Sequence, residues 1–291
     1  MLSYRHGFHA GSFADVLKHT VLIAVLDYFN QKEAAYCYID THAGAGMYPL
    51  NHRFMQKNHE YEKGIGKLFG KTTADPVLDR YLKVIQSFNP KGLAQYPGSP
   101  KIAQAVSRDH DRLQLIELHP SDAEELKQHF FRSHRVKVFS TEASQGLVSF
   151  LPPKEKRGLI FIDPSYELSS EYSSLIHLLK MAAERFSSGT YILWYPVIER
   201  RAVELFIRKV AVLPFKSGLR IEHCLHPDGL DHGMTGNGLI VLNGPYNLKE
   251  TLTPSLKKLN EYLSEGRGSF RLDTLSMGPK APSIPKLGAR S

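Results

Sequence analysis

The chain has 291 residues, of which 42% are hydrophobic and 23% charged, and its formal net charge is +8. This length allows a large buried core, or a core with a smaller appendage. Because the N-terminal stretch is polar and no run of roughly 18 apolar residues is present, we expect neither a secretory leader nor a membrane span. Two cysteines, Cys37 and Cys224, are too few for a disulfide framework or a four-ligand zinc site. We therefore expect a cytoplasmic protein with reduced thiols.

Short apolar runs alternate with helix-length amphipathic segments along the chain. This alternation is typical of an α/β sheet with crossover helices. Strands are expected at 35–39, 113–116, 136–139, 159–162, 191–195, 220–225 and 239–242. Helices are expected at 13–29, 100–105, 121–131, 170–185, 199–210 and 254–263. The pattern thus predicts seven strands in one sheet.

One interval is too long for a crossover. Residues 48–95 are polar and basic, but they carry regularly spaced aromatic residues, so we expect an inserted helical subdomain there. The core would then comprise 1–47 and 96–275, and the proline- and glycine-containing segment 276–291 would be a flexible tail.

The first expected strand runs into YIDTHAGAGMY, which places Asp40, Gly44 and Gly46 in a D-x-x-x-G-x-G spacing. Glycines allow the backbone to approach a ligand closely, and open α/β sheets bind ligands at the carboxyl ends of their strands. A dinucleotide fingerprint fails here because Pro49 occupies the third glycine position. A plain turn of small residues is the alternative interpretation.

Two acids follow the next strands. Glu117, in LIELHPSD, is placed to accept both hydroxyls of a ribose, and Glu142, in STEASQG, is placed to accept an exocyclic amine. Glu117 could equally be a solvated acid at a strand end, and for Glu142 a surface acid is the default interpretation.

The fourth expected strand leads into Asp163-Pro164-Ser165-Tyr166. Proline holds the preceding residue extended, so Asp163 and the Pro164 carbonyl can converge as two acceptors while Tyr166 offers a stacking face. Such a site suits the amino group of a flat base, whose hydrogens the acceptors would bind and whose lone pair they would aim at an electrophilic carbon. A strand followed by a simple turn is the other interpretation.

At these motifs the chain resembles S-adenosylmethionine-dependent amino-methyltransferases, and more narrowly the bacterial 23S rRNA adenine-N6 methyltransferases of the RlmJ family. The resemblance covers residues 1 to about 250 and rests on FHAGSFADVLKHT, DTHAGAG, YPGSP, ELHPSD, RGLIFIDPSYE, LWYP and HGMTGNGLIVLN. It implies a seven-stranded Rossmann-like class I core with a helical insertion, S-adenosyl-L-methionine as the methyl donor, and no metal.

The resemblance also implies roles for individual residues. Asp163, with Pro164 and Tyr166, would be catalytic, and Tyr4, His6 and Tyr166 would meet the substrate adenosine. RNA contacts are expected from basic residues that include Arg5, Arg53, Lys57, Lys63, Lys67 and Lys71. The cofactor site would be lined by Lys18, His19, Asp40, His42, Gly44, Gly46, Ser99, Glu117, Glu142, Ala143 and Asp163.

The sequence departs from the family pattern at two places. Ser165 replaces the second proline of the catalytic motif, and Glu142 stands where the pattern has Asp-Gly. The implied substrate is one adenine of 23S rRNA, protein-free or in an early assembly intermediate, acted on by a monomer. Two rivals stay open, namely a DNA adenine-N6 methyltransferase and a non-catalytic rRNA-binding assembly factor.

Overall fold

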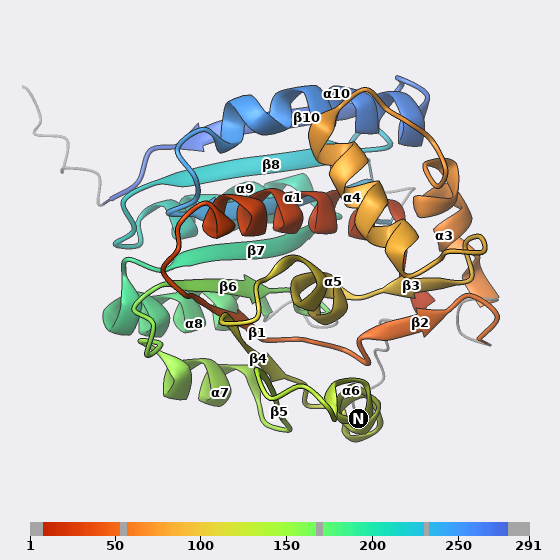
Figure 1. Cartoon of the computed structure of the whole chain (residues 1–291). Helices are drawn as coiled ribbons and strands as arrows, with labels where there is room; N and C mark the ends of the chain where they lie inside the picture. The colour runs from red at the N-terminus through yellow and green to blue at the C-terminus, as the bar shows by residue number, and fades with distance from the viewer. Residues whose placement is uncertain (1–7, 53–56, 167–170, 230–232, 279–291) are drawn as a thin grey trace, which may run out of the picture.

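The computed structural model describes residues 8–52, 57–166, 171–229 and 233–278. Its main element is an eight-stranded sheet with the order β10-β8-β9-β7-β6-β1-β4-β5 (Figure 1). The strands are β1 (Cys37–Asp40), β4 (Arg112–Ile116), β5 (Val136–Phe139), β6 (Gly158–Ile162), β7 (Thr190–Val197), β8 (Gly218–Cys224), β9 (Gly236–Leu242) and β10 (Ser269–Leu275). A separate two-stranded sheet pairs β2 (Met47–Pro49) with β3 (Gln95–Pro97).

The five strands from β5 to β7 pair in parallel, whereas β9 pairs antiparallel with both β7 and β8. All seven expected strands are present in this doubly wound, Rossmann-like arrangement. The predicted number was nevertheless wrong by one, because β10 adds an eighth strand antiparallel to β8. This edge strand is largely exposed and alternates polar with apolar residues, so it carries only a weak signal of a strand.

Helices cover both faces of the sheet. One apolar cluster contains side chains of α1 (Phe13–Asn30), α4 (Pro76–Ser87), α5 (Ser99–Val106), α6 (Pro120–Phe130) and α10 (Leu248–Ser264). The other contains side chains of α7 (Ala143–Phe150), α8 (Glu171–Phe186) and α9 (Arg200–Ala211). Successive residues of β1 alternate between the clusters, with Tyr38 in the first and Cys37 and Ile39 in the second.

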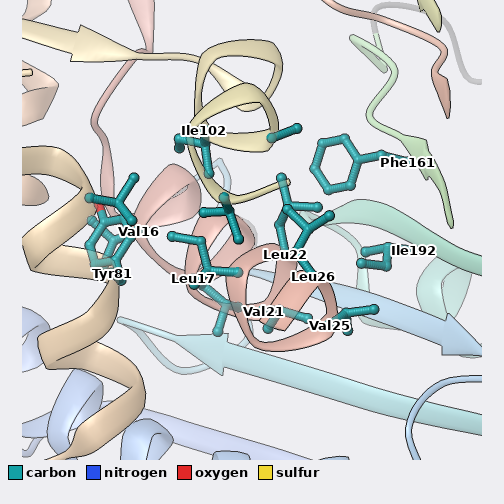
Figure 2. Packing of buried hydrophobic residues seen from close by; sticks show 14 of the residues in the cluster. Val16, Leu17, Val21, Leu22, Val25, Leu26, Tyr81, Ile102, Phe161 and Ile192 are labelled. Atoms are coloured by element: carbon teal, nitrogen blue, oxygen red, sulfur yellow. The ribbon is translucent and has the colours of Figure 1, made fainter. Parts of the chain in front are cut away.

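The helix α1 lies in the middle of the first cluster. Its apolar residues, such as Leu17, Leu22 and Leu26, are almost fully buried and lie close to Ile102 of α5 and Phe161 of β6 (Figure 2). Burial extends around the helix and includes Asp15, Lys18, His19 and Thr20. A helix buried on all sides needs partners for such polar groups, and several of these partners lie at the site described below.

Two helices differ from the sequence prediction. The helix α7 was missed, and α10 begins at Leu248 rather than at Pro254. Proline normally disrupts a helix interior, which made Pro254 resemble a first-turn residue, but here it lies inside α10.

The region 48–95 contains α3 (Glu60–Lys63), the short 3₁₀ helix η2 (Ile65–Lys67) and α4. Buried residues from it, including Ile65, Leu78 and Tyr81, belong to the same apolar cluster as α1. The division into a core and an inserted subdomain stays a prediction. In the part of the chain that the structure describes, no helix combines the length and apolarity that crossing a membrane would require.

Candidate active site

The four strand-end motifs lie at one edge of the sheet, around the point where the strand order reverses. Strands β1 and β6 are neighbours, with Asp40 opposite Phe161, and the chain continues from β1 towards β4 but from β6 towards β7. Open α/β sheets bind ligands outside the carboxyl ends of their strands at such a point. The sequence therefore brings Asp40, Glu117, Glu142 and Asp163 to the edge where a ligand site is expected.

Asp40 is fully buried at the end of β1. Its Oδ2 accepts hydrogen bonds from the Tyr38 hydroxyl (2.8 Å) and the Ser99 hydroxyl (2.7 Å), and its Oδ1 accepts one from the His42 backbone N–H (3.2 Å). Burial raises the pKa of Asp40 to about 6, although these donors favour the ionised form. Asp40 and Ser99 therefore bind each other and hold the loop after β1.

The glycines of this loop adopt left-handed conformations, with φ values of 62° at Gly44 and 83° at Gly46. The Gly44 N–H donates to Glu117 Oε2 (2.7 Å), and the His119 N–H donates to Glu117 Oε1 (2.7 Å). Burial raises the pKa of Glu117 despite these two bonds. An ionised carboxylate has about four acceptor positions, so Glu117 can still receive hydroxyl groups while it ties the glycine loop to the end of β4.

Glu142 is the N-cap of α7, the helix that was missed. Its Oε2 accepts from the backbone N–H groups of Ser144 (3.0 Å) and Gln145 (3.2 Å). Ser, Thr, Asp and Asn are the preferred N-caps, so a glutamate there gave no clear signal of a helix start. Ala143 is the first residue of α7 and lines the pocket described next.

A pocket of about 600 Å³ opens next to these groups. One side is formed by His42, Glu142, Ala143 and the Pro164–Ser165 turn, and the other by α8, including His177. Burial lowers the pKa of His42 to about 4, so its imidazole is neutral at pH 7. The α8 wall was not anticipated, because its contribution depends on the fold and not on a local motif.

Asp163 lies on the other side of the same turn and is paired with a lysine of α1. Its side chain is 11% exposed, and its Oδ2 accepts a hydrogen bond from Lys18 Nζ at 2.5 Å. Lys18 is 3% exposed, and its Nζ also lies 3.3 Å from Asp15 Oδ1 and 4.5 Å from the Trp194 ring centroid. Burial alone would lower the pKa of Lys18, but the charges of Asp163 and Asp15 outweigh it, so the pKa is raised. Lys18 is therefore an ammonium cation at neutral pH.

Tyr166 is fixed by aromatic neighbours. It has a left-handed φ of 53°, and its hydroxyl donates to the Trp194 carbonyl at 2.7 Å. Its ring centroid lies 5.6 Å from that of Trp194 and 5.1 Å from that of Tyr172. A left-handed tyrosine is uncommon and has to be held by its surroundings, as it is here.

His19 is 1% exposed inside the core. Its Nδ1 lies 2.7 Å from the Tyr96 hydroxyl, and the two rings stack with centroids 5.6 Å apart. The geometry thus gives His19 a core partner on β3, and its cofactor role stays a prediction.

Three residues at the site were not anticipated, namely Asp15, Trp194 and Asn237. Asn237 is fully buried, and its Oδ1 accepts from Trp194 Nε1 (3.2 Å). The sequence signals were present, since these residues lie in FHAGSFADVLKHT, LWYP and HGMTGNG, but nothing local showed which side chains converge.

Several predicted contacts lie outside the described residues. These are Tyr4, His6, Arg5 and Arg53. Lys57 and Lys63 are exposed, whereas Lys67 donates to the Leu263 carbonyl (3.1 Å) and Lys71 lies 4.8 Å from the Tyr262 ring centroid.

Comparison with known proteins identifies the family. The family model described as "Ribosomal RNA large subunit methyltransferase D, RlmJ" matches residues 33–276. Two proteins named Ribosomal RNA large subunit methyltransferase J are similar to the chain. The one from Haemophilus influenzae is 39% identical over 95% of this chain and 99% of its own length, and the one from Escherichia coli is 40% identical over 90% and 94%.

A crystal structure of a Legionella pneumophila protein superposes with a TM-score of 0.84 at 38% identity, covering 92% of this chain and 99% of that one. The Rossmann-like sheet is that of the class I S-adenosylmethionine-dependent methyltransferases. The chain belongs to the RlmJ family of ribosomal RNA large-subunit methyltransferases.

Proposed function

We propose that the protein methylates the N6 amine of one adenine in 23S rRNA, with Asp163, Pro164 and Tyr166 as the catalytic residues. As a member of this family it is an S-adenosylmethionine-dependent rRNA methyltransferase. The observation that supports the catalytic assignment is the anchoring of Asp163 by Lys18 (2.5 Å) at the end of β6, next to Tyr166.

The residues at the crevice suit the methyl donor. When bound, S-adenosylmethionine supplies an electrophilic methyl group on a sulfonium, which becomes a neutral thioether after the methyl group has left. Gly44 allows close backbone approach, and Glu117 keeps acceptor positions for ribose hydroxyls. We propose the full predicted set as the cofactor site, with His42, Glu142 and Ala143 at the pocket that α8 closes.

The substrate amine requires acceptors for its hydrogens. Lys18 holds Asp163 Oδ2, so the carboxylate is oriented and its other oxygen can accept from the amine together with the Pro164 carbonyl. As N6 bonds to the methyl carbon it gains positive charge, which the negative charge of Asp163 stabilises. After transfer the methylated amine loses one proton, and because Lys18 is already protonated, this proton passes to solvent water.

Tyr166 is proposed to stack on the flipped adenine. Stacking on an aromatic side chain contributes about 1–3 kcal/mol per base, and base flipping gives the enzyme access to N6. Tyr4 and His6 are proposed to complete the adenosine site.

The substrate is proposed to be 23S rRNA that is protein-free or in an early assembly intermediate, and the enzyme to act in the cytoplasm as a monomer. The exposed Lys57 and Lys63 suit phosphate contacts, which would make binding weaken with added salt.

The decisive experiment is a methyl-transfer assay with labelled cofactor on deproteinised, unmodified 23S rRNA and on duplex DNA, followed by mapping of the modified nucleotide. We expect N6-methyladenosine at one position of the RNA. A preference for DNA would overturn the substrate assignment. Calorimetry that detected no cofactor binding at millimolar concentration would instead favour a non-catalytic assembly factor.

A further inference from the structure

The buried acid Asp15 lies outside the predicted site, yet it contacts Lys18. We propose that Asp15 is a positioning residue for methyl transfer, which holds the Lys18 ammonium group against Asp163. This inference rests on the proposed function, since it assumes that Asp163 acts on the substrate amine.

The contacts around Lys18 come from three elements of the fold. Its Nζ lies 2.5 Å from Asp163 Oδ2 after β6, 3.3 Å from Asp15 Oδ1 on α1, and 4.5 Å from the centroid of the Trp194 ring on β7. An ammonium group has three N–H donors on a flexible stem, so neighbours on several sides are needed to fix its direction. Asp15 supplies the only one of these contacts that comes from the same helix as Lys18.

Asp15 is itself fixed from the other side. It is 1% exposed, and its Oδ2 accepts the Gly11 backbone N–H at 2.9 Å. Gly11 has a φ of 76°, and its carbonyl accepts the Ile65 N–H at 2.9 Å. A Cβ at Gly64 would lie 2.1 Å from the Gly11 oxygen, so this close backbone approach requires glycine. The carboxylate therefore connects Lys18 to a rigid backbone junction.

An acid in the first turn of a helix has an ordinary explanation, since it stabilises the positive end of the helix dipole. Such acids can do so while exposed to solvent. Asp15 is buried, and a buried carboxylate is stabilised by an ion pair of the kind that Lys18 provides. The two explanations predict different effects of neutralising Asp15: the pKa of Lys18 falls if Asp15 holds Lys18, and it does not change if Asp15 only stabilises the helix dipole.

The charged and titratable groups that act on Lys18 are Asp15 on α1, Asp163 after β6, and His42 after β1. Burial lowers the pKa of Lys18, and the two acids raise it above its usual value. Without the charge of Asp15, burial is opposed by Asp163 alone, so the pKa of Lys18 falls. Deprotonated Lys18 no longer orients Asp163 as a cation, and transfer should then fail at alkaline pH.

The experiment is the pH dependence of single-turnover methyl transfer to 23S rRNA between pH 7 and pH 10. We expect the wild-type rate to be flat over this range. Asp15→Asn should still bind the cofactor in calorimetry at pH 7, transfer more slowly at pH 8, and lose activity severalfold more between pH 8 and pH 10. Asp15→Glu, which keeps the charge, should restore the flat profile.

Asp75→Asn is the matched control. Asp75 is also buried and caps a helix, accepting from the Leu78 N–H (2.8 Å), but it lies on α4 and pairs with the Ser255 hydroxyl (2.7 Å). Neutralising Asp75 should change the midpoint temperature of thermal unfolding without changing how the rate of methyl transfer depends on pH between pH 8 and pH 10. Asp15→Ser, whose hydroxyl can still accept from Gly11, is a second neutral variant in case Asp15→Asn does not fold.

A profile of Asp15→Asn that superimposes on that of the wild type would overturn the inference, as would an equal shift in Asp75→Asn. Loss of the proposed function would look different, because the wild type itself would then not methylate 23S rRNA at pH 8.

Discussion

Two groups of charged side chains serve the molecule in different ways. At the site, one ammonium cation, Lys18, lies between two carboxylates, Asp15 and Asp163. Around α9, three guanidinium groups contact three carboxylates. We call this second group the α9 cluster, and it consists of Arg200, Arg220, Arg271, Glu204, Glu222 and Asp228.

Arg200 and Arg220 make the close hydrogen bonds of the α9 cluster. Arg200 binds Asp228 with two parallel contacts (2.9 and 3.0 Å) and Glu222 with a third (2.7 Å). Arg220 bridges Glu222 (2.7 Å) and Glu204 (2.8 Å). The planar fork of arginine matches carboxylate oxygens, so each group is held in one geometry.

In the α9 cluster three cations face three acids, whereas at the site a single point charge faces two acids. Among Lys18, Asp15 and Asp163 one negative charge is therefore left uncompensated, next to the turn that carries Pro164 and Tyr166. The comparison indicates that arginine forks build fixed structure here, whereas the lysine leaves a carboxylate able to receive a further donor such as a substrate amine.

The largest expected effect is on chemistry. Asp163→Ala should reduce methyl transfer by about 10³-fold or more, because it removes the charge that stabilises the developing cation on N6. Calorimetry should show cofactor binding weakened at most modestly. Full retained activity in the labelled-methyl assay would refute the role of Asp163. It would also refute the inference that the Lys18 site, unlike the α9 cluster, serves catalysis.

The α9 cluster should respond in stability. Glu222→Ala leaves Arg200 and Arg220 without their shared buried partner, and loss of one member of a buried pair costs about 3–5 kcal/mol of unfolding free energy. Urea unfolding measures this cost.

Glu204→Ala is the matched control, since Glu204 binds the same Arg220 but is 33% exposed, and it should cost about 1 kcal/mol or less. Equal costs for the two variants would show that burial does not set the strength of this cluster.

The sequence indicated which strand-end residues converge better than it indicated the α9 cluster, for a physical reason. Asp163, Glu117 and Gly44 lie at strand ends, where parallel topology alone brings them to one edge. Arg200, Glu222 and Asp228 belong to different elements, and nothing local marks them as partners. The same limit hid Asp15 and the α8 wall, because their contacts depend on how helices pack over the sheet.

The elements of the fold that were missed also lacked a clear local signal in the sequence. Seven strands of the main sheet were predicted, whereas β10 was missed because its residues are exposed or half-buried at an edge. The helix α7 was missed because Glu142, its cap, is not a usual N-cap residue.

The pH dependence of stability tests a buried site acid that binds no cation. Asp40 has a folded pKa of about 6, raised by burial from 3.8, so the folded state keeps a proton that the unfolded state loses between these values. The stability that this proton contributes is thus fully present below pH 3.8 and is lost as pH rises through 6. Because one pKa unit corresponds to about 1.36 kcal/mol, the total loss is on the order of 3 kcal/mol of unfolding free energy. Urea unfolding at pH 4 to 7 should show this loss in the wild type relative to Asp40→Asn.

Ser99→Ala sharpens that measurement. It removes the 2.7 Å hydroxyl donor that favours ionised Asp40, so the window of lost stability should extend to higher pH. A difference between wild type and Asp40→Asn that does not vary with pH would contradict the burial of an ionisable carboxyl there.

The smallest expected effect separates the two ends of the Tyr166 side chain. Tyr166→Ala should lower kcat/KM for RNA by a factor that corresponds to about 1–3 kcal/mol of activation free energy, the contribution of one stacked base. Tyr166→Phe keeps the ring but loses the 2.7 Å bond to the Trp194 carbonyl, and should cost about 1 kcal/mol or less. If Phe is as defective as Ala, the hydroxyl anchor and not the stacking face determines activity. The side chain would then belong with the fixed contacts of the α9 cluster rather than with the groups that meet substrate.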